Sequence, residues 1–266
     1  MLLTLATRSL ASIISDSPRG EGTMTMLDLP DYAIRHLELR GLNVEASMLS
    51  GWSLEQLDRL RDRADKAGCP CLVLIEDTPL TFGGSSAKKR DAAADRVQRL
   101  AAAAHRLGCS AMSIACAGSD DEETFEQIAS EVKNVMPEIE RLELNVLLAP
   151  CEGLCHDPER LTELIKRIGG FRIGSLPSFG HAAATGDAAG TLRKLAPYAG
   201  AVHATVEGFN SKGEHKAWDL TECVSAIRSV GFVNTLAIDC ISSKEPVADV
   251  ERARTILEQA IEAEKK

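Results

Sequence analysis

The sequence predicts a single (β/α)8 barrel over residues 1–266, and three observations predict it. Short apolar runs alternate with segments of helical periodicity from one end of the chain to the other. This alternation gives eight strand–helix units in about 250 residues, the expected count for a closed barrel of parallel strands. No linker, charge block or low-complexity stretch divides the units, so we expect one α/β domain rather than two.

The apolar runs are expected to be strands because they are short and are bounded by turn residues. The first run, LLTLAT, is followed by RSLASIIS, which is not the glycine-rich phosphate loop usual after the first strand of an open doubly wound sheet. That difference favours the closed barrel over the open sheet. The expected strands are residues 2–7, 42–49, 69–77, 111–118, 142–150, 171–179, 201–209 and 235–241.

The helical segments carry start and stop signals. Ser53, with Gln56 three residues later, forms a capping box, and Gly68 ends the same helix. Asp157 followed by Pro158 begins another helix. The expected helices are residues 27–41, 53–68, 87–108, 119–139, 157–170, 187–196, 219–231 and 245–266.

Composition argues against several classes of protein. The formal net charge is −9, and the KKR run at 88–90 is too short to form the basic face of a nucleic-acid binder. No run of about 18 apolar residues exists, so we expect no membrane span. Arg8 interrupts the N-terminal apolar stretch, which favours a first strand over a signal peptide. Eight cysteines, several in strand-like runs, indicate reduced thiols in a cytoplasmic protein.

Polar residues at the carboxyl ends of the expected strands are the candidates for function, because the chemistry of such barrels lies there. Side chains alternate along a strand, so if His203 points into the barrel, Ala201, Thr205 and Glu207 point inward as well. If Asp239 points inward, Cys240 faces the helices. The candidates are Glu45, Glu76, Asp77, Ser113, Cys116, Cys151, Glu152, Ser178, His181, His203, Thr205, Glu207 and Asp239.

Several stretches have the order and spacing of a known family. They are DLPDYAIRHLELRGLNVEASML, LNVLLAPCEGLCHDPERLTELIKRIGG, RIGSLPSFGHAAATGD, LRKLAPYAGAVHATVEG and WDLTECVSAIRSVGFVNTLAIDC. On these stretches the chain resembles the xylose isomerase-like TIM barrel superfamily of sugar phosphate isomerases and epimerases. The resemblance covers nearly the whole chain. It implies a divalent cation held by a Glu on the fifth strand, an Asp on the sixth, a His on the seventh and a Glu on the eighth.

Carried over position by position, the implied site is incomplete. The fifth-strand Glu falls on Ala149 and the sixth-strand Asp on Ser178, whereas the seventh-strand His is kept as His203. The eighth-strand Glu becomes Asp239, whose side chain is one methylene shorter, and the family's substrate-contacting His is kept as His181. The two glutamates of the family also form its acid–base pair. We therefore expect metal-assisted proton transfer to be lost or greatly weakened.

Each candidate keeps a structural alternative. His203 is a metal ligand, a ligand-binding residue or a hydrogen-bonded remnant of the site. Asp239 and His181 are the catalytic candidates, but the first can be a structural ion-pair partner and the second part of a loop. Glu45 and Glu207 are candidates for ligand binding, as are His181 and His203.

Two cysteines in CEGLC, Cys151 and Cys155, suggest a softer zinc site together with a histidine. A Cys-x3-Cys pair alone is a weak signal because no second cysteine pair follows at zinc-ribbon spacing. Buried, chemically silent thiols are the alternative that we favour.

The resulting hypothesis is a sugar or sugar-phosphate isomerase or epimerase that acts on a small carbohydrate at the carboxyl-terminal mouth of the barrel. Its metal, if any, is Mn, Mg or Zn held by His203 and Asp239. The alternative is a non-catalytic relative that binds a sugar-like ligand or a protein partner. A related nuclease acting at abasic DNA sites is disfavoured by the net charge and by only six histidines. The family also suggests a homodimer.

Overall fold

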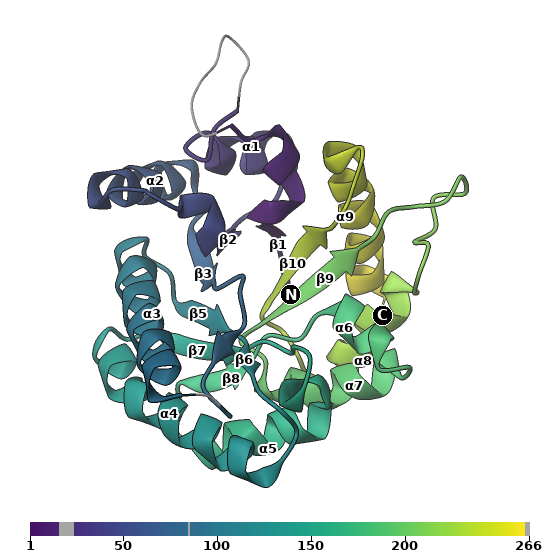
Figure 1. Cartoon of the computed structure of the whole chain (residues 1–266). Coiled ribbons are helices and arrows are strands. Elements are labelled where there is room, and N and C mark those ends of the chain that lie inside the picture. Colours follow the sequence, from purple (N-terminus) through teal and green to yellow (C-terminus); the bar gives the residue numbers. More distant parts are fainter. Residues whose placement is uncertain (16–23, 85, 264–266) are drawn as a thin grey trace.

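The computed structural model describes residues 1–15, 24–84 and 86–263, and eight parallel strands form a barrel in it, as the sequence predicts (Figure 1). Hydrogen-bonded neighbours run in the order β8-β7-β5-β3-β2-β1-β10-β9. The strands are β1 (Leu2–Ala6), β2 (Leu42–Glu45), β3 (Cys71–Ile75), β5 (Ala111–Ile114), β7 (Asn145–Leu148), β8 (Ile173–Ser175), β9 (Ala201–Val206) and β10 (Thr235–Cys240).

The barrel closes between β8 and β9 through isolated bridges rather than a continuous ladder. Ser175 pairs with Ala199, and Ser178 pairs with His203. The backbone N–H of His203 donates to the carbonyl of Pro177 at 2.9 Å. A Cβ at Gly174 would lie 2.5 Å from the Tyr198 carbonyl oxygen, so only glycine permits this close approach at the seam.

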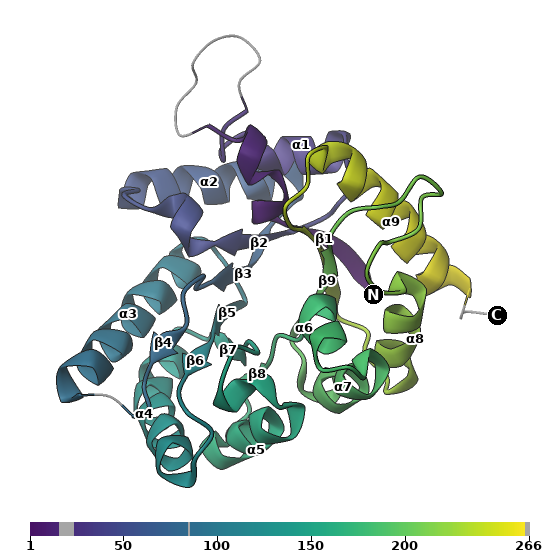
Figure 2. The same cartoon turned by 45° about the vertical axis from the view of Figure 1, so that its right-hand side comes forward.

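Helices surround the ring of strands, and Figure 2 shows them from a second direction. A two-stranded parallel ribbon, β4 with β6, lies beside the barrel. No helix in the described ranges is long and apolar enough to cross a membrane. The further elements are β4 (Leu80–Thr81), β6 (Cys116–Ala117), α1 (Leu29–Arg35), α2 (Leu54–Ala67), α3 (Ala87–Arg106), α4 (Glu122–Arg141), α5 (Pro158–Ile168), α6 (Phe179–Ala184), α7 (Ala188–Leu195), α8 (Leu220–Ser229), α9 (Pro246–Ala263), and the 3-10 helices η1 (Thr7–Ile13), η2 (Ala46–Leu49), η3 (Leu154–His156) and η4 (Ala196–Tyr198).

The helix signals read from the sequence are present in the structure. Ser53 caps α2, and its side chain and that of Gln56 form the reciprocal capping box. The side chain of Asp157 accepts from the first backbone N–H groups of α5. The helix α6 was not expected; the Ser178 side chain caps it by accepting the backbone N–H of His181.

The buried apolar side chains form two clusters, one on each face of the barrel sheet. The larger cluster lies between strands and helices and contains Cys240. The smaller cluster contains Val73, Leu147 and Ala201, which the strand alternation places inside the barrel. Ala201 shares the inward parity of His203, as the alternation along β9 predicts.

Candidate functional site

Four neighbouring strands bring charged side chains together at their carboxyl ends. The strands β9, β10, β1 and β2 are consecutive in the sheet, and all run parallel. Because parallel strands end at the same edge, residues from distant parts of the sequence meet there. The residues are Arg8 in the first turn after β1, Glu45 at the end of β2, His203 in β9 and Asp239 in β10.

The Arg8 guanidinium holds the Asp239 carboxylate by two hydrogen bonds. Nε of Arg8 lies 2.5 Å from Oδ1, and Nη2 contacts Oδ2. Asp239 is fully buried, whereas 46% of the Arg8 side chain remains exposed. Burial opposes ionisation of Asp239, but the hydrogen bonds from Arg8 and His203 outweigh it and hold the pKa of that carboxyl well below its usual value. The hydrogen bonding to Asp239 raises the pKa of Arg8 in turn.

Both ring nitrogens of His203 have partners within the chain. Nδ1 lies 3.3 Å from Oδ2 of Asp239, and Nε2 lies 3.0 Å from the amide nitrogen of Asn43. An amide nitrogen only donates, so Nε2 is the acceptor and the proton of the neutral ring is on Nδ1, where it donates to Asp239. His203 therefore links Asn43 to the Arg8–Asp239 pair.

Glu45 is a buried carboxyl with one oxygen bound and one without a partner. Its Oε2 accepts from the Thr7 hydroxyl at 2.6 Å and from the backbone N–H of Arg8 at 2.9 Å. Its Oε1 has no hydrogen bond to the described residues and lies 3.9 Å from Nε of Arg8. Burial raises the pKa of Glu45 to about 7, although the bond from Thr7 lowers it in part. Both protonation states are thus accessible near neutral pH.

Further polar atoms inside the barrel have no partner in the described part of the chain. They are the hydroxyls of Thr4, Ser113 and Thr205 and the carbonyl oxygen of the Asn43 amide, and all four residues are at most 4% exposed. The strand alternation points them toward the barrel interior on β1, β5, β9 and β2. Buried polar groups are normally hydrogen-bonded, so these four atoms are exceptions within the barrel.

The divalent cation that the resemblance implies does not fit these residues. Both oxygens of Asp239 are bound to Arg8, and both nitrogens of His203 are bound to Asp239 and Asn43. Ala149 brings no ligand atom, and the Ser178 hydroxyl caps α6. Among the residues with assigned positions, no group of three or more His, Cys, Asp or Glu side chains could hold a metal ion.

Two of the candidates for catalysis or ligand binding, His181 and Glu207, lie outside the Arg8–Asp239–His203 network. His181 sits in α6, where one ring nitrogen contacts the carbonyl of His156 at 3.0 Å and the other is buried without a partner among the described residues. Burial lowers the pKa of His181. The Glu207 side chain is exposed beyond the end of β9, and its backbone N–H donates to His215 at 2.9 Å. The structure gathers Glu45, but neither of these two, with His203.

The cysteine pair after β7 does not form the zinc site considered above. All eight cysteines are free, and no third metal-binding side chain completes a site with Cys151 and Cys155 within the described ranges. Cys151 is half-buried, and its thiol lies 3.3 Å from the carbonyl oxygen of Cys116. Its hydrogen bond with Cys155 lowers the pKa of Cys151, although burial acts against this.

Sequence reasoning overlooked Arg8 and Asn43. Arg8 was used only as an interruption of an apolar stretch, although it lies two residues beyond Ala6 and four beyond Thr4, on the same parity. That charge at the end of the first strand was the available signal. Asn43 shares its parity with Glu45 and could have been found in the same way.

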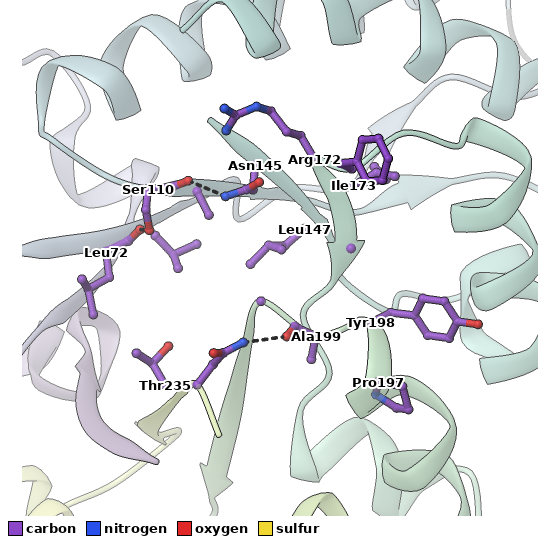
Figure 3. Close-up of a pocket in the computed structure, with 16 residues that line it drawn as sticks. Leu72, Ser110, Asn145, Leu147, Arg172, Ile173, Pro197, Tyr198, Ala199 and Thr235 are labelled. Atoms are coloured by element: carbon purple, nitrogen blue, oxygen red, sulfur yellow. Dashed lines mark hydrogen bonds between the residues drawn. The ribbon is translucent and has the colours of Figure 1, made fainter. Parts of the chain in front are cut away.

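A cavity of about 460 Å³ lies at the opposite end of the barrel (Figure 3). Its lining comes mainly from the amino ends of strands, including Asn145, whose amide nitrogen donates to the carbonyl of Ser110 at 3.1 Å. Leu147 and Tyr198 contribute apolar surface. Because the lining contains no Asp, Glu, His or Cys, we place the candidate site at the carboxyl ends instead.

Comparison with known proteins agrees with the barrel and with its family. A family model described as xylose isomerase-like TIM barrel matches residues 33–263. A structure of L-ribulose 3-epimerase superposes with a TM-score of 0.78 at 15% identity, covering 99% of this chain and 96% of that one. A D-psicose 3-epimerase determined in the presence of D-fructose gives 0.75 at 11% identity, covering 100% and 98%. The IOLI protein, described with a binding zinc atom, gives 0.72 at 14% identity, covering 98% and 96%. A search of curated protein sequences gave no significant match.

Proposed function

Because the chain belongs to the xylose isomerase-like TIM barrel family, we propose that it is a sugar or sugar-phosphate isomerase or epimerase whose proton-transferring group is Glu45. The site lies at the carboxyl ends of the strands, where this fold carries its chemistry. It lacks two of the four ligands that a metal-dependent relative would use. Its chemistry therefore falls to the residues that the structure does bring together.

One observation carries the proposal: Oε1 of Glu45 is buried without a partner among the described residues, on a carboxyl whose pKa is raised to about 7. A general base works best when its pKa lies near the operating pH. Isomerisation and epimerisation both require removal of a proton from carbon next to a carbonyl and its return. Glu45 suits both halves of an aldose–ketose isomerisation, as the base at one carbon and then as the acid at its neighbour, whereas epimerisation needs a second acid on the opposite face of the carbon.

The substrate class follows from the lining of the barrel. The unpartnered hydroxyls of Thr4, Ser113 and Thr205 can each donate and accept, as the hydroxyls of a sugar do. Two of the similar structures carry the names of sugar epimerases. A small polyhydroxylated carbonyl compound fits this combination best.

Asp239 positions the Arg8 guanidinium and does not transfer a proton. Its carboxylate is fully buried and engaged by Arg8 and His203, so it has no oxygen left to accept a substrate proton. It fixes the position of the guanidinium and neutralises it. We therefore move the catalytic role from Asp239 to Glu45.

A panel of ketoses, aldoses and their phosphates, incubated with the protein in D2O, tests the proposal. Proton NMR would show loss of the signal from the C–H next to the carbonyl. We expect Glu45→Gln, which keeps the shape but cannot take the proton, to slow this exchange by about 100-fold or more. The exposed Glu55→Gln on α2 is the matched control and should exchange like wild type. Exchange that survives in Glu45→Gln, or no exchange with any sugar, would contradict the proposal.

The near-complete burial of Glu45, His203 and Asp239, at 2%, 5% and 0% exposure, favours a second candidate. Side chains this deeply buried offer little surface for chemistry on a substrate, so this candidate is a relative that binds a sugar-like ligand at the barrel mouth without reaction. A sugar that raises the melting temperature but whose C–H signals stay intact in D2O would support this non-catalytic function.

A further inference from the structure

The guanidinium of Arg8 is a positive charge at the carboxyl ends of the strands. It lies close to the polar side chains at the ends of β2, β9 and β10. Its guanidinium is bound along one edge, through Nε and Nη2, by Asp239. The third nitrogen, Nη1, has no acceptor among the described residues, and 46% of the side chain is exposed. The bound edge fixes the plane of the group while leaving Nη1 as a donor for something outside the chain.

This arrangement works against a metal ion. A cation that reached Asp239 would have to displace two charge-assisted hydrogen bonds and then stand beside the guanidinium it displaced, since the backbone of Arg8 is fixed by its N–H bond to Glu45. It would also need a free His203 nitrogen, and the Asn43 amide donates to Nε2. Arg8 therefore already supplies the positive charge that the Asp239 carboxylate needs.

The guanidinium can stabilise the negative charge that forms on the carbonyl oxygen, which a divalent cation would otherwise stabilise. In the proposed reaction, Glu45 removes a proton from carbon next to the carbonyl, and the C–H electron pair forms a carbon–carbon double bond. The carbonyl π pair then moves onto its oxygen, and the resulting negative charge needs a hydrogen-bond donor to stabilise it. Oε1 of Glu45 lies 3.9 Å from Nε of Arg8, so the base lies beside the guanidinium that carries the proposed donor, Nη1. Glu45 then delivers the proton to the former carbonyl carbon, while the hydroxyl proton on the first carbon passes to the former carbonyl oxygen, and this completes an aldose–ketose isomerisation without any oxidant or reductant.

We infer that the Arg8 guanidinium replaces the divalent cation in this barrel, binding the carbonyl oxygen of the substrate through Nη1 so that the site works without a metal ion. This inference rests on the proposed function for its substrate, but its central statement, that Arg8 and not a metal neutralises Asp239, is independent of activity. The two can therefore be tested separately.

Calorimetric titration of EDTA-treated wild type with Mn²⁺, Zn²⁺ and Mg²⁺ tests the metal statement. We expect no binding heat. A single ion per chain whose binding is lost in Asp239→Asn would overturn the inference, whatever the activity. This arm needs no folded Arg8 variant, and Asp239→Asn serves only to locate an ion that has already been detected.

Exchange of substrate C–H in D2O tests the role of Arg8 in the reaction. We expect the wild-type rate to be the same in EDTA as in excess Mn²⁺. We expect Arg8→Met to lower kcat by about 100-fold, as removal of an oxyanion donor does, and Arg8→Lys to recover part of it. Arg35→Met, at an exposed arginine on α1, is the control for loss of a surface charge. Exchange that appears only with added metal, or that is unaffected in Arg8→Met, would overturn the inference. Absence of exchange in wild type under every condition would refute the proposed function, and calorimetry alone would then decide the metal statement.

Discussion

Arg8 and Asp239 are 231 residues apart in the sequence and form a two-point ion pair at the carboxyl ends of β1 and β10. The pair exists because β1 lies between β2 and β10 in the sheet, so that the first and last strands are neighbours. Asp239 is fully buried, and Arg8 compensates its charge while the His203 ring donates a hydrogen bond to it. The stability of the barrel mouth and its proposed chemistry both depend on this pair.

Removal of Arg8 should destabilise the fold through Asp239. Arg8→Met leaves a buried carboxylate without its main partner, which costs about 3 kcal/mol of unfolding free energy, at the low end for a broken buried pair because the guanidinium is partly exposed. Adding Asp239→Asn should recover most of this loss, because the neutral amide no longer needs the charge. Urea unfolding of the two single variants and the double variant gives the coupling. Simple additivity of the two single losses would contradict the ion pair.

The buried Glu45 predicts a fall in stability as the pH rises. The folded state holds the Glu45 proton more tightly than the unfolded chain, because burial raises its pKa from 4.5 to about 7. Its stabilising contribution is fully present below pH 4.5 and is lost as the pH rises to about 7, by roughly 3 kcal/mol. Glu45→Gln removes that loss, so the variant should gain on wild type between pH 4.5 and 7. Urea unfolding across this range measures the difference, and a pH-independent difference would show that Glu45 is not perturbed.

The ring of His203 should be the neutral tautomer with its proton on Nδ1. The Asn43 amide nitrogen donates to Nε2, and Nδ1–H donates to Asp239. Nitrogen-15 NMR of the labelled protein at neutral pH distinguishes the states, with His203→Gln used to assign the signals. A proton on Nε2 alone, or on both nitrogens, would contradict this hydrogen-bond arrangement.

Cys151 should be the most reactive of the eight thiols. It is half-buried whereas the other seven are buried, and its hydrogen bond with Cys155 lowers its pKa. The pKa values of the seven others are raised. The thiolate is the reactive form, so iodoacetamide should label Cys151 first. Peptide mass spectrometry follows the reaction: Cys151→Ser should abolish the fast phase and Cys155→Ala should slow it. Fast labelling of any other cysteine in wild type would oppose this prediction.

The barrel could be predicted because its signals are local. The capping box of Ser53 and the cap at Asp157 are set by residues within one turn, and the apolar alternation is set within one strand. The same alternation placed Ala201 inside the barrel and Cys240 outside it, as the two apolar clusters show. Local rules of this kind do not depend on how the chain closes on itself.

The site was harder to predict because it depends on closure. Glu45, His203 and Asp239 were candidates from the sequence, and the structure brings them together. Arg8 was not a candidate because its partner, Asp239, lies on the last strand, and no residue near Arg8 in the sequence predicts that contact. His181 and Glu207 were chosen by position along the chain, and a short helix and an exposed strand end separate them from the network. A resemblance in sequence order could not predict that Arg8 compensates the charge of Asp239.

Anomalous diffraction from crystals soaked in Mn²⁺ tests the central claim most directly, because it reports both the ion and the position of the guanidinium. We predict Arg8 bound to Asp239 by its Nε and Nη2 edge, with no anomalous peak at His203 or Asp239. A manganese peak coordinated by His203 and Asp239, with Arg8 turned away, would contradict the account and would return this barrel to metal-dependent chemistry.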